Sequence, residues 1–210
     1  MAVYDLKDQE EIENFKYFWR SWGRWLFALL VVAAIGYFVW GVMYSSHQRS
    51  VNNEAVAVFD QWAENQQAGK LAEAAKLLTQ LQSQYPTSVS AAQATLMQAG
   101  AAFDQGKYDE AAGHLNWVLK YHQEPLIRAM AIQRLATVQL QQQKYDDAIA
   151  TLGMNTDEAY AGILLETKGD VYAAQGKRSE AAAAYKQAMD KLPKDDQGRE
   201  FIQLKIDQLN

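Results

Sequence analysis

Apolar residues are distributed unevenly along the chain, and one segment contains almost nothing else. From Trp25 to Tyr44 there are twenty residues without a charged side chain, Asn, Gln, Pro or His. At about 1.5 Å per residue, a helix of this length is roughly 30 Å long, close to the thickness of the bilayer hydrocarbon. A core helix of a soluble protein would show a polar stripe, which this segment lacks. The pattern predicts a single transmembrane helix over residues 25–44.

Aromatic residues stand near both ends of this segment, where tryptophan and tyrosine collect at membrane interfaces. A cleaved signal peptide is the alternative, but the apolar run is too long for one, and the following YSSHQRS offers no small-residue cleavage site. We therefore expect a permanent anchor. The expected membrane belt consists of Trp19, Trp22, Trp25, Trp40 and Tyr44.

Basic residues predict the orientation of the anchor. Four Lys or Arg precede it, whereas Arg49 alone lies in the twenty residues that follow. Because the more basic flank stays in the cytoplasm, we expect a cytoplasmic amino terminus and residues 45–210 on the other side. In a Gram-negative cell, this is a single-pass inner-membrane protein with a periplasmic domain.

The tail before the anchor, residues 1–24, has its own pattern. Ile12, Phe15, Trp19 and Trp22 recur at helical spacing, with charged residues on the other face. The pattern predicts a cytoplasmic amphipathic helix that lies in the membrane interface. Binding of a partner protein by this tail is the alternative.

Beyond residue 50, the sequence repeats itself. Four segments read GKLAEAA from Gly69, GKYDEAA from Gly106, QKYDDAI from Gln143 and GKRSEAA from Gly176. The alanines that follow the acidic residue, here called the anchor alanines, are separated by 37, 37 and 33 residues: Ala74, Ala111, Ala148 and Ala181. A period near 34 with a helix-turn-helix pattern is typical of tetratricopeptide repeats.

The repeat predicts an all-α fold, in which one transmembrane helix is followed by a tetratricopeptide α-solenoid. We expect repeats at about 55–88, 92–125, 129–160 and 162–195, and an end helix at 196–209 that covers the last apolar face. The fourth repeat matches the consensus best, with Gly169 and Tyr172 joining the anchor alanines as packing positions. The third lacks the turn glycine, and its second helix runs early into Gly153.

Candidate chemistry changes this picture little. The three histidines do not have metal-ligand spacing, and the Gly-Lys pairs lack the other residues of a phosphate loop. The chain has no cysteine, so thiolate metal sites and a catalytic thiol are excluded. With 20 basic and 25 acidic residues, it also lacks the basic excess of a general nucleic-acid binder. We expect no catalytic residue, no metal and no cofactor.

A tetratricopeptide array acts by presenting a groove lined by the first helix of each pair. Alignment on the anchor alanines places seven side chains there: Leu96, Phe103, Met130, Leu140, Ile163, Glu166 and Asp170. This set is apolar and acidic, without the basic residues of a carboxylate clamp, and it would suit hydrophobic polypeptide segments. The alternative is that several of these residues belong to the core shared by adjacent repeats.

A charged tail, one span, the connection SSHQRS and a tetratricopeptide domain, in this order, resemble the YfgM family, the ancillary subunits of the bacterial SecYEG translocon. The resemblance runs from EEIENFKYFW to the closing KIDQLN. It implies a non-enzymatic inner-membrane protein that associates with the SecYEG translocon and a PpiD-like periplasmic chaperone. Such a protein would help transfer translocating polypeptides to periplasmic chaperones.

Other classes of protein share parts of this organisation. A membrane-anchored scaffold for envelope biogenesis or cell division, which never contacts nascent chains, is the main alternative. An anchored tetratricopeptide protein of lipopolysaccharide assembly would have a cytoplasmic array and a cysteine metal site, which the charge bias and the missing cysteines oppose. A membrane-anchored enzyme would need a catalytic motif.

Overall fold

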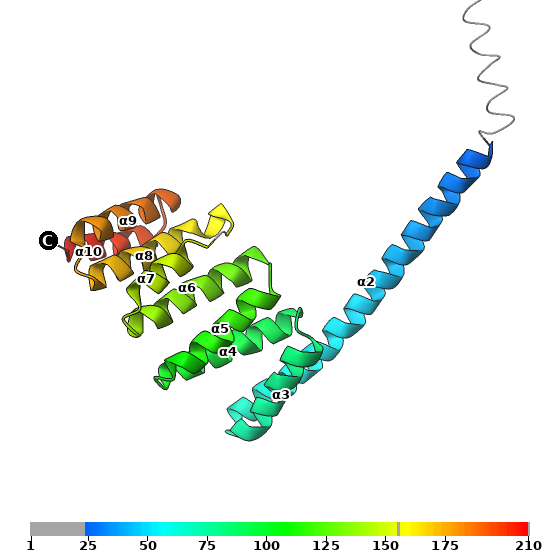
Figure 1. Cartoon of the computed structure of the whole chain (residues 1–210), viewed down its shortest axis with the longest axis horizontal. Coiled ribbons are helices and arrows are strands. Elements are labelled where there is room, and N and C mark those ends of the chain that lie inside the picture. The colour runs from blue at the N-terminus through cyan, green and yellow to red at the C-terminus, as the bar shows by residue number, and fades with distance from the viewer. Residues whose placement is uncertain (1–23, 155, 210) are drawn as a thin grey trace, which may run out of the picture. The chain divides into compact units, whose positions relative to one another are not determined.

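The computed structural model describes residues 24–154 and 156–209, apart from the side chains of residues 24 and 42–50. All regular elements in these ranges are helices, which confirms the all-α class for this part of the chain (Figure 1). The chain forms two compact units, residues 1–51 and residues 52–210.

The first unit is described from Arg24 onward and consists of the first part of helix α2 (Arg24–Gln67). Its side chains from Trp25 to Trp40 are exposed, and Trp25 and Trp40 themselves are 78% and 63% exposed. Trp19, Trp22 and the predicted amphipathic tail lie outside the described residues, as does the side chain of Tyr44. Within the described ranges, no helix combines the length and the apolar character needed to cross a membrane.

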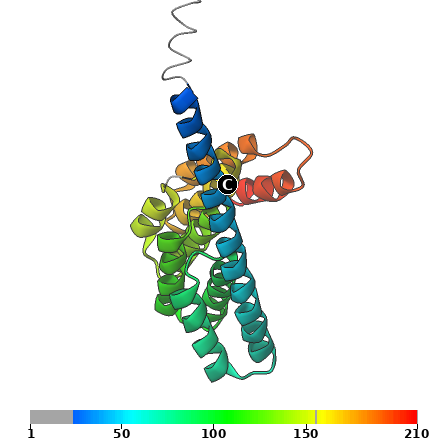
Figure 2. The same ribbon diagram turned by 90° about the vertical axis from the view of Figure 1, so that its right-hand side faces the viewer.

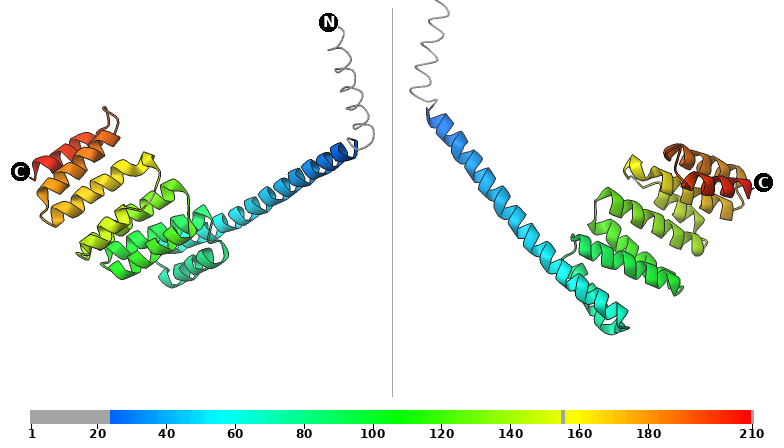
Figure 3. Two further views of the ribbon diagram at one scale, coloured as in Figure 1. Left: turned by 45° about the horizontal axis from the view of Figure 1, so that its top comes forward. Right: turned by 180° about the vertical axis from the view of Figure 1, so that it is seen from behind.

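The second unit consists of paired helices that stack in chain order (Figure 3). The last part of α2 pairs with α3 (Leu71–Gln84), and α4 (Val89–Asp104) with α5 (Tyr108–Tyr121). Two further pairs follow, α6 (Pro125–Gln141) with α7 (Tyr145–Leu152) and α8 (Ala161–Ala174) with α9 (Arg178–Lys191). A short 3-10 helix, η2 (Glu158–Tyr160), leads into α8, and α10 (Gly198–Asp207) ends the stack.

The turn inside each pair needs one residue in the left-handed region. Gly69, Gly106 and Gly176 have φ values of 69°, 73° and 74°, which glycine adopts without steric cost. In the third pair, Gln143 takes this position with φ 59°. All four turns have the same hydrogen bonds; for example, Lys107 N donates to Ala102 O at 2.8 Å, which closes a Schellman motif. The missing glycine of the third repeat is therefore replaced without a change of turn type.

Four clusters of buried apolar side chains form the core, and each contains one anchor alanine. Ala74, Ala111, Ala148 and Ala181 are at most 1% exposed. A methyl side chain at these positions allows the two helices of a pair to approach closely.

Two further packing positions lie on α8, where it meets α9. A Cβ added to Gly169 would lie 2.4 Å from the ring of Tyr185, so only glycine fits there. Tyr172 is half-buried and packs against the last core cluster.

The end helix α10 lies beside α9 (Figure 2). Ile202 is 1% exposed, and Ile206 and Leu209 pack against the same cluster. Because a stack of repeats leaves an apolar face at its end, α10 has the arrangement that such an array needs to remain soluble.

Candidate functional site

The predicted groove residues lie on three helices, α4, α6 and α8, which are the first helices of pairs two to four. These helices contact one another directly, α4 with α6 and α6 with α8. We call the sides of α4, α6 and α8 that carry the seven predicted residues the groove face.

Two cavities lie between α4 and α6 on the groove face. The Phe103 cavity has a volume of about 210 Å³, and its lining includes Gly100, Phe103, Leu115 and Thr137. The Met130 cavity has a volume of about 310 Å³ and is bordered by Val89, Leu96, Met97, Ile127 and Met130. Both are mainly apolar, so they fit side chains such as leucine or methionine better than charged groups.

The five apolar groove residues differ in their surroundings. Phe103 and Met130 are half-buried and line the two cavities, whereas Leu96 is only 6% exposed and belongs mainly to the core. Leu140 packs half-buried against the core cluster between α6 and α8 and lines neither of these cavities. Ile163 is 48% exposed. The groove face therefore contains both core and cavity residues.

The sequence prediction missed two residues of the groove face, Met97 and Arg134. Arg134 borders both cavities, and its Nη1 donates a hydrogen bond to the carbonyl oxygen of Leu96 at 3.1 Å. Met97 and Arg134 each stand 14 residues before the anchor alanine of their repeat, as does the buried Thr167. The residue type at this offset differs between the repeats, so no sequence pattern marks Met97 and Arg134 as groove residues.

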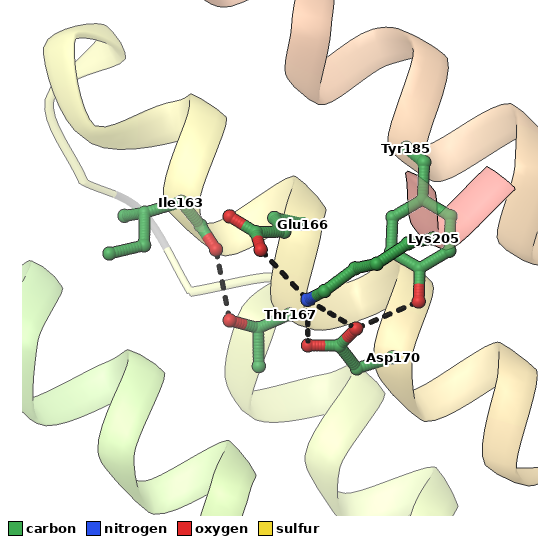
Figure 4. Close-up of polar contacts among 6 residues, drawn as sticks. All are labelled: Ile163, Glu166, Thr167, Asp170, Tyr185 and Lys205. Carbon is green, nitrogen blue, oxygen red and sulfur yellow. Dashed lines mark hydrogen bonds and ion pairs between the residues drawn. The ribbon is translucent and has the colours of Figure 1, made fainter. Parts of the chain in front are cut away.

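The acidic residues of α8 are paired with the end helix (Figure 4). Lys205 of α10 places its Nζ 2.8 Å from Glu166 Oε1, and 2.8 and 3.1 Å from the two carboxylate oxygens of Asp170. The hydroxyl of Tyr185 donates to Asp170 Oδ1 at 2.7 Å. Both carboxylates therefore already have hydrogen-bond partners within the chain.

Both donors in this network have altered acidity. Burial would lower the pKa of Lys205, but its hydrogen bonds to Asp170 and Glu166 outweigh burial and raise it. The pKa of Tyr185 is also raised, first by burial and then by its hydrogen bond to Asp170. At neutral pH, the lysine is therefore charged and the tyrosine is protonated.

The described residues do not contain a site for a metal ion. In the parts of the chain that the structure describes, no three His, Asp or Glu side chains come close enough together to hold one. His114 lies 3.8 Å from Glu110, and burial lowers its pKa despite this carboxylate. His122 is buried at the end of α5, beside the ring of Trp117.

The helical-repeat fold agrees with the comparisons with known proteins. The tetratricopeptide repeat-like domain family matches residues 16–210. An ancillary SecYEG translocon subunit of Neisseria gonorrhoeae is 50% identical over 210 residues, which are 100% of both chains.

Two more distant relatives have the same description. The ancillary SecYEG translocon subunit of Haemophilus influenzae is 25% identical over 89% of this chain and 90% of its own. The corresponding subunit of Aggregatibacter actinomycetemcomitans is 24% identical over 99% of this chain and 100% of its own. The resemblance drawn from the sequence is thus confirmed: the chain belongs to the tetratricopeptide repeat-like family of ancillary SecYEG translocon subunits.

Proposed function

We propose that this chain is a non-enzymatic inner-membrane protein ancillary to the SecYEG translocon, and that its groove face receives segments of translocating polypeptides. It would help transfer them to a PpiD-like periplasmic chaperone. The observation that carries the proposal is the pair of apolar cavities on α4 and α6, in a chain related over its full length to an ancillary SecYEG translocon subunit.

Association with the translocon is tested by co-purification. The full chain, extracted in mild detergent, is expected to retain SecYEG and a PpiD-like chaperone. A preparation in which the chain is folded but SecYEG is absent would contradict the translocon association and favour the scaffold for envelope biogenesis or cell division.

We further propose that residues 25–44 form the membrane anchor, with residues 1–24 in the cytoplasm and residues 45–210 in the periplasm. Two observations support this. Basic residues are concentrated before the segment, and apolar side chains such as Leu29 and Val32 are 65% and 69% exposed. Transfer of exposed apolar surface out of water is favourable by about 25 cal/mol per Å², so a lipid environment would stabilise this helix.

The orientation is tested with a reporter enzyme fused after Asn210. A reporter that works only in the periplasm should be active, and one that works only in the cytoplasm should be inactive. Cytoplasmic activity would contradict the orientation and the proposed transfer of polypeptides.

The groove is tested with photocrosslinking side chains at Phe103 and Met130, which line the two cavities. We expect them to capture translocating polypeptides or a chaperone. The matched control is Asn116, an exposed residue of α5, from which no capture is expected. Equal capture at all three positions, or none from a folded array, would favour the scaffold alternative.

A further inference from the structure

Among the residues that the structure describes, Arg134 alone borders both cavities of the groove face. Its hydrogen bond to Leu96 O fixes the guanidinium against α4, between the apolar linings. An arginine side chain has five N–H donors, and this bond uses only one nitrogen. The remaining donors are available to a group that enters the groove.

The surroundings of Arg134 differ from those of three other half-buried cations in the second unit, Lys205, Arg128 and Arg199. Lys205 pairs with two carboxylates, and Arg128 and Arg199 bind the carbonyls at the ends of α5 and α9, where a cation is favourable. Arg134 instead bonds a carbonyl in the middle of α4, and no carboxylate among residues 52–154 and 156–209 forms an ion pair with it. The groove thus presents a positive charge between two apolar cavities.

The separation of the cavities selects the conformation of a ligand. Along α4 and α6, the lining of the Phe103 cavity lies about five to seven residues beyond that of the Met130 cavity, a distance of about 8–11 Å. In an extended strand, side chains on one face are about 7 or 13 Å apart, because they alternate at about 3.3 Å per residue. In an α-helix, positions i and i+7 are about 10.5 Å apart. The helical spacing fits the two cavities.

We propose that the groove face binds an amphipathic helix of a partner polypeptide with apolar residues at i and i+7 and a carboxylate at i+3 or i+4. The two apolar side chains occupy the Met130 and Phe103 cavities. The carboxylate lies between them on the same helix face and pairs with Arg134, because residues three and four apart are neighbours on a helix. This inference rests on the proposed function, of which it specifies the polypeptide class.

The experiment uses fluorescently labelled 15-residue alanine-based peptides and the full-length protein in detergent micelles, with binding followed by anisotropy. One peptide has Leu at i and i+7 and Glu at i+4. A second replaces the Glu with Gln, and a third, of the same composition as the first, places Leu, Glu and Leu at i, i+2 and i+4. We expect the first to bind about tenfold or more tightly than the second, since a hydrogen bond to a charged group contributes enough for such a factor. The third should bind more weakly than the first.

Two variants connect this preference to the site. Arg134→Gln should make the Glu and Gln peptides bind equally. Gly100→Leu should abolish binding, because a Cβ at Gly100 meets no atom within 4 Å and the side chain extends into the Phe103 cavity. Gly113→Leu is the matched control: its Cβ also has open space, but it lies exposed on α5 and should leave binding unchanged.

Equal affinity for the Glu and Gln peptides, tighter binding of the i, i+2, i+4 peptide, or full binding by Gly100→Leu would each overturn the inference. Because these measurements need no translocon, they are independent of the co-purification. Loss of SecYEG with retained peptide preference would contradict the proposed function alone.

Discussion

Two parts of the array differ on the groove face: the open half, which contains α4 and α6, and the closed half, which runs from α8 to α10. Between α4 and α6 lie two apolar cavities with Arg134 between them. On α8, the corresponding positions carry Glu166 and Asp170, and Lys205 of the end helix pairs with both. The open half therefore has apolar cavities on the groove face, whereas in the closed half a lysine of the end helix already pairs with the acidic residues of this face.

This difference shows what a repeat position does and does not determine. Leu96 and Glu166 both stand 15 residues before the anchor alanine of their repeat, so their side chains point to the same face. Leu96 packs into the core with α6, while Glu166 meets a lysine from α10. The repeat fixes the direction of a side chain, and the next helix fixes its partner.

The largest expected effect comes from breaking the packing of the closed half with Ile202→Ala. Ile202 is 1% exposed in the last core cluster, and removal of a buried isoleucine costs about 2–4 kcal/mol of unfolding free energy. Urea unfolding followed by circular dichroism measures it. Leu204→Ala, in the same helix but 53% exposed, should change stability by less than about 0.5 kcal/mol. Equal losses from the two variants would show that α10 does not pack as described.

Replacing a glycine with alanine should lower stability in α8, in the closed half, but raise it in α5, outside that half. Gly169→Ala places a Cβ 2.4 Å from the Tyr185 ring, and such overpacking costs about 1–3 kcal/mol. Gly113→Ala meets open space in the middle of α5, so it should raise stability by up to about 1 kcal/mol through helix propensity. Thermal unfolding of both variants checks this; stabilisation by Gly169→Ala would contradict the close contact of α8 and α9.

The charge network of the closed half predicts a smaller effect, with a defined pH dependence. Lys205→Met should cost about 1 kcal/mol at neutral pH, because the ion pairs it removes are partly exposed. Folding raises the pKa values of Lys205 and Tyr185. The stability that these two groups contribute is therefore complete below their pKa values in the unfolded chain, which are near 10. This contribution is lost as the pH rises through their pKa values in the folded chain.

The difference in unfolding free energy between the wild type and Lys205→Met should therefore be constant from about pH 6 to 9 and shrink above about pH 10. Lys186→Met, an exposed lysine on α9, is the control and should match the wild type throughout. A difference that grows above pH 10 would contradict the proposed charge states.

Much of the fold could be predicted from the sequence, because the repeat is a local signal. The spacing of the anchor alanines predicts the tetratricopeptide array, and each of the four core clusters contains one of them. The family was identified correctly as well. The repeat is read from short segments of consecutive residues, such as GKYDEAA from Gly106, whose recurrence can be recognised without knowing which side chains meet in space.

The groove was harder to predict, because its character depends on pairs of residues far apart in sequence. Lys205 lies 39 residues from Glu166, and Arg134 lies 38 residues from Leu96. Neither pair has a sequence signal of its own. The sequence places Glu166 and Asp170 of α8 among the groove residues. Only the structure shows that both pair with Lys205 of the end helix.

The smallest expected effect concerns the third repeat, which joins the two halves. Its second helix, α7, has 8 residues where α5 and α9 have 14, and its turn uses Gln143 with φ 59°. A residue with a Cβ costs about 1 kcal/mol or more in the left-handed region, and glycine removes this cost but loses conformational entropy. Gln143→Gly should therefore raise the unfolding free energy by about 0.5–1 kcal/mol, measured by urea unfolding.

The neighbouring Gln142 is the matched control for this prediction. Its φ is −80°, which any residue adopts, so Gln142→Gly adds only the entropic cost and should lower stability by up to about 1 kcal/mol. A gain of unfolding free energy at Gln143 and a loss at Gln142 would show that the turn carries backbone strain, which the other three repeats avoid with glycine. If both variants destabilise the chain equally, the left-handed turn at Gln143 is unstrained, and the short α7 alone distinguishes the third repeat from its neighbours.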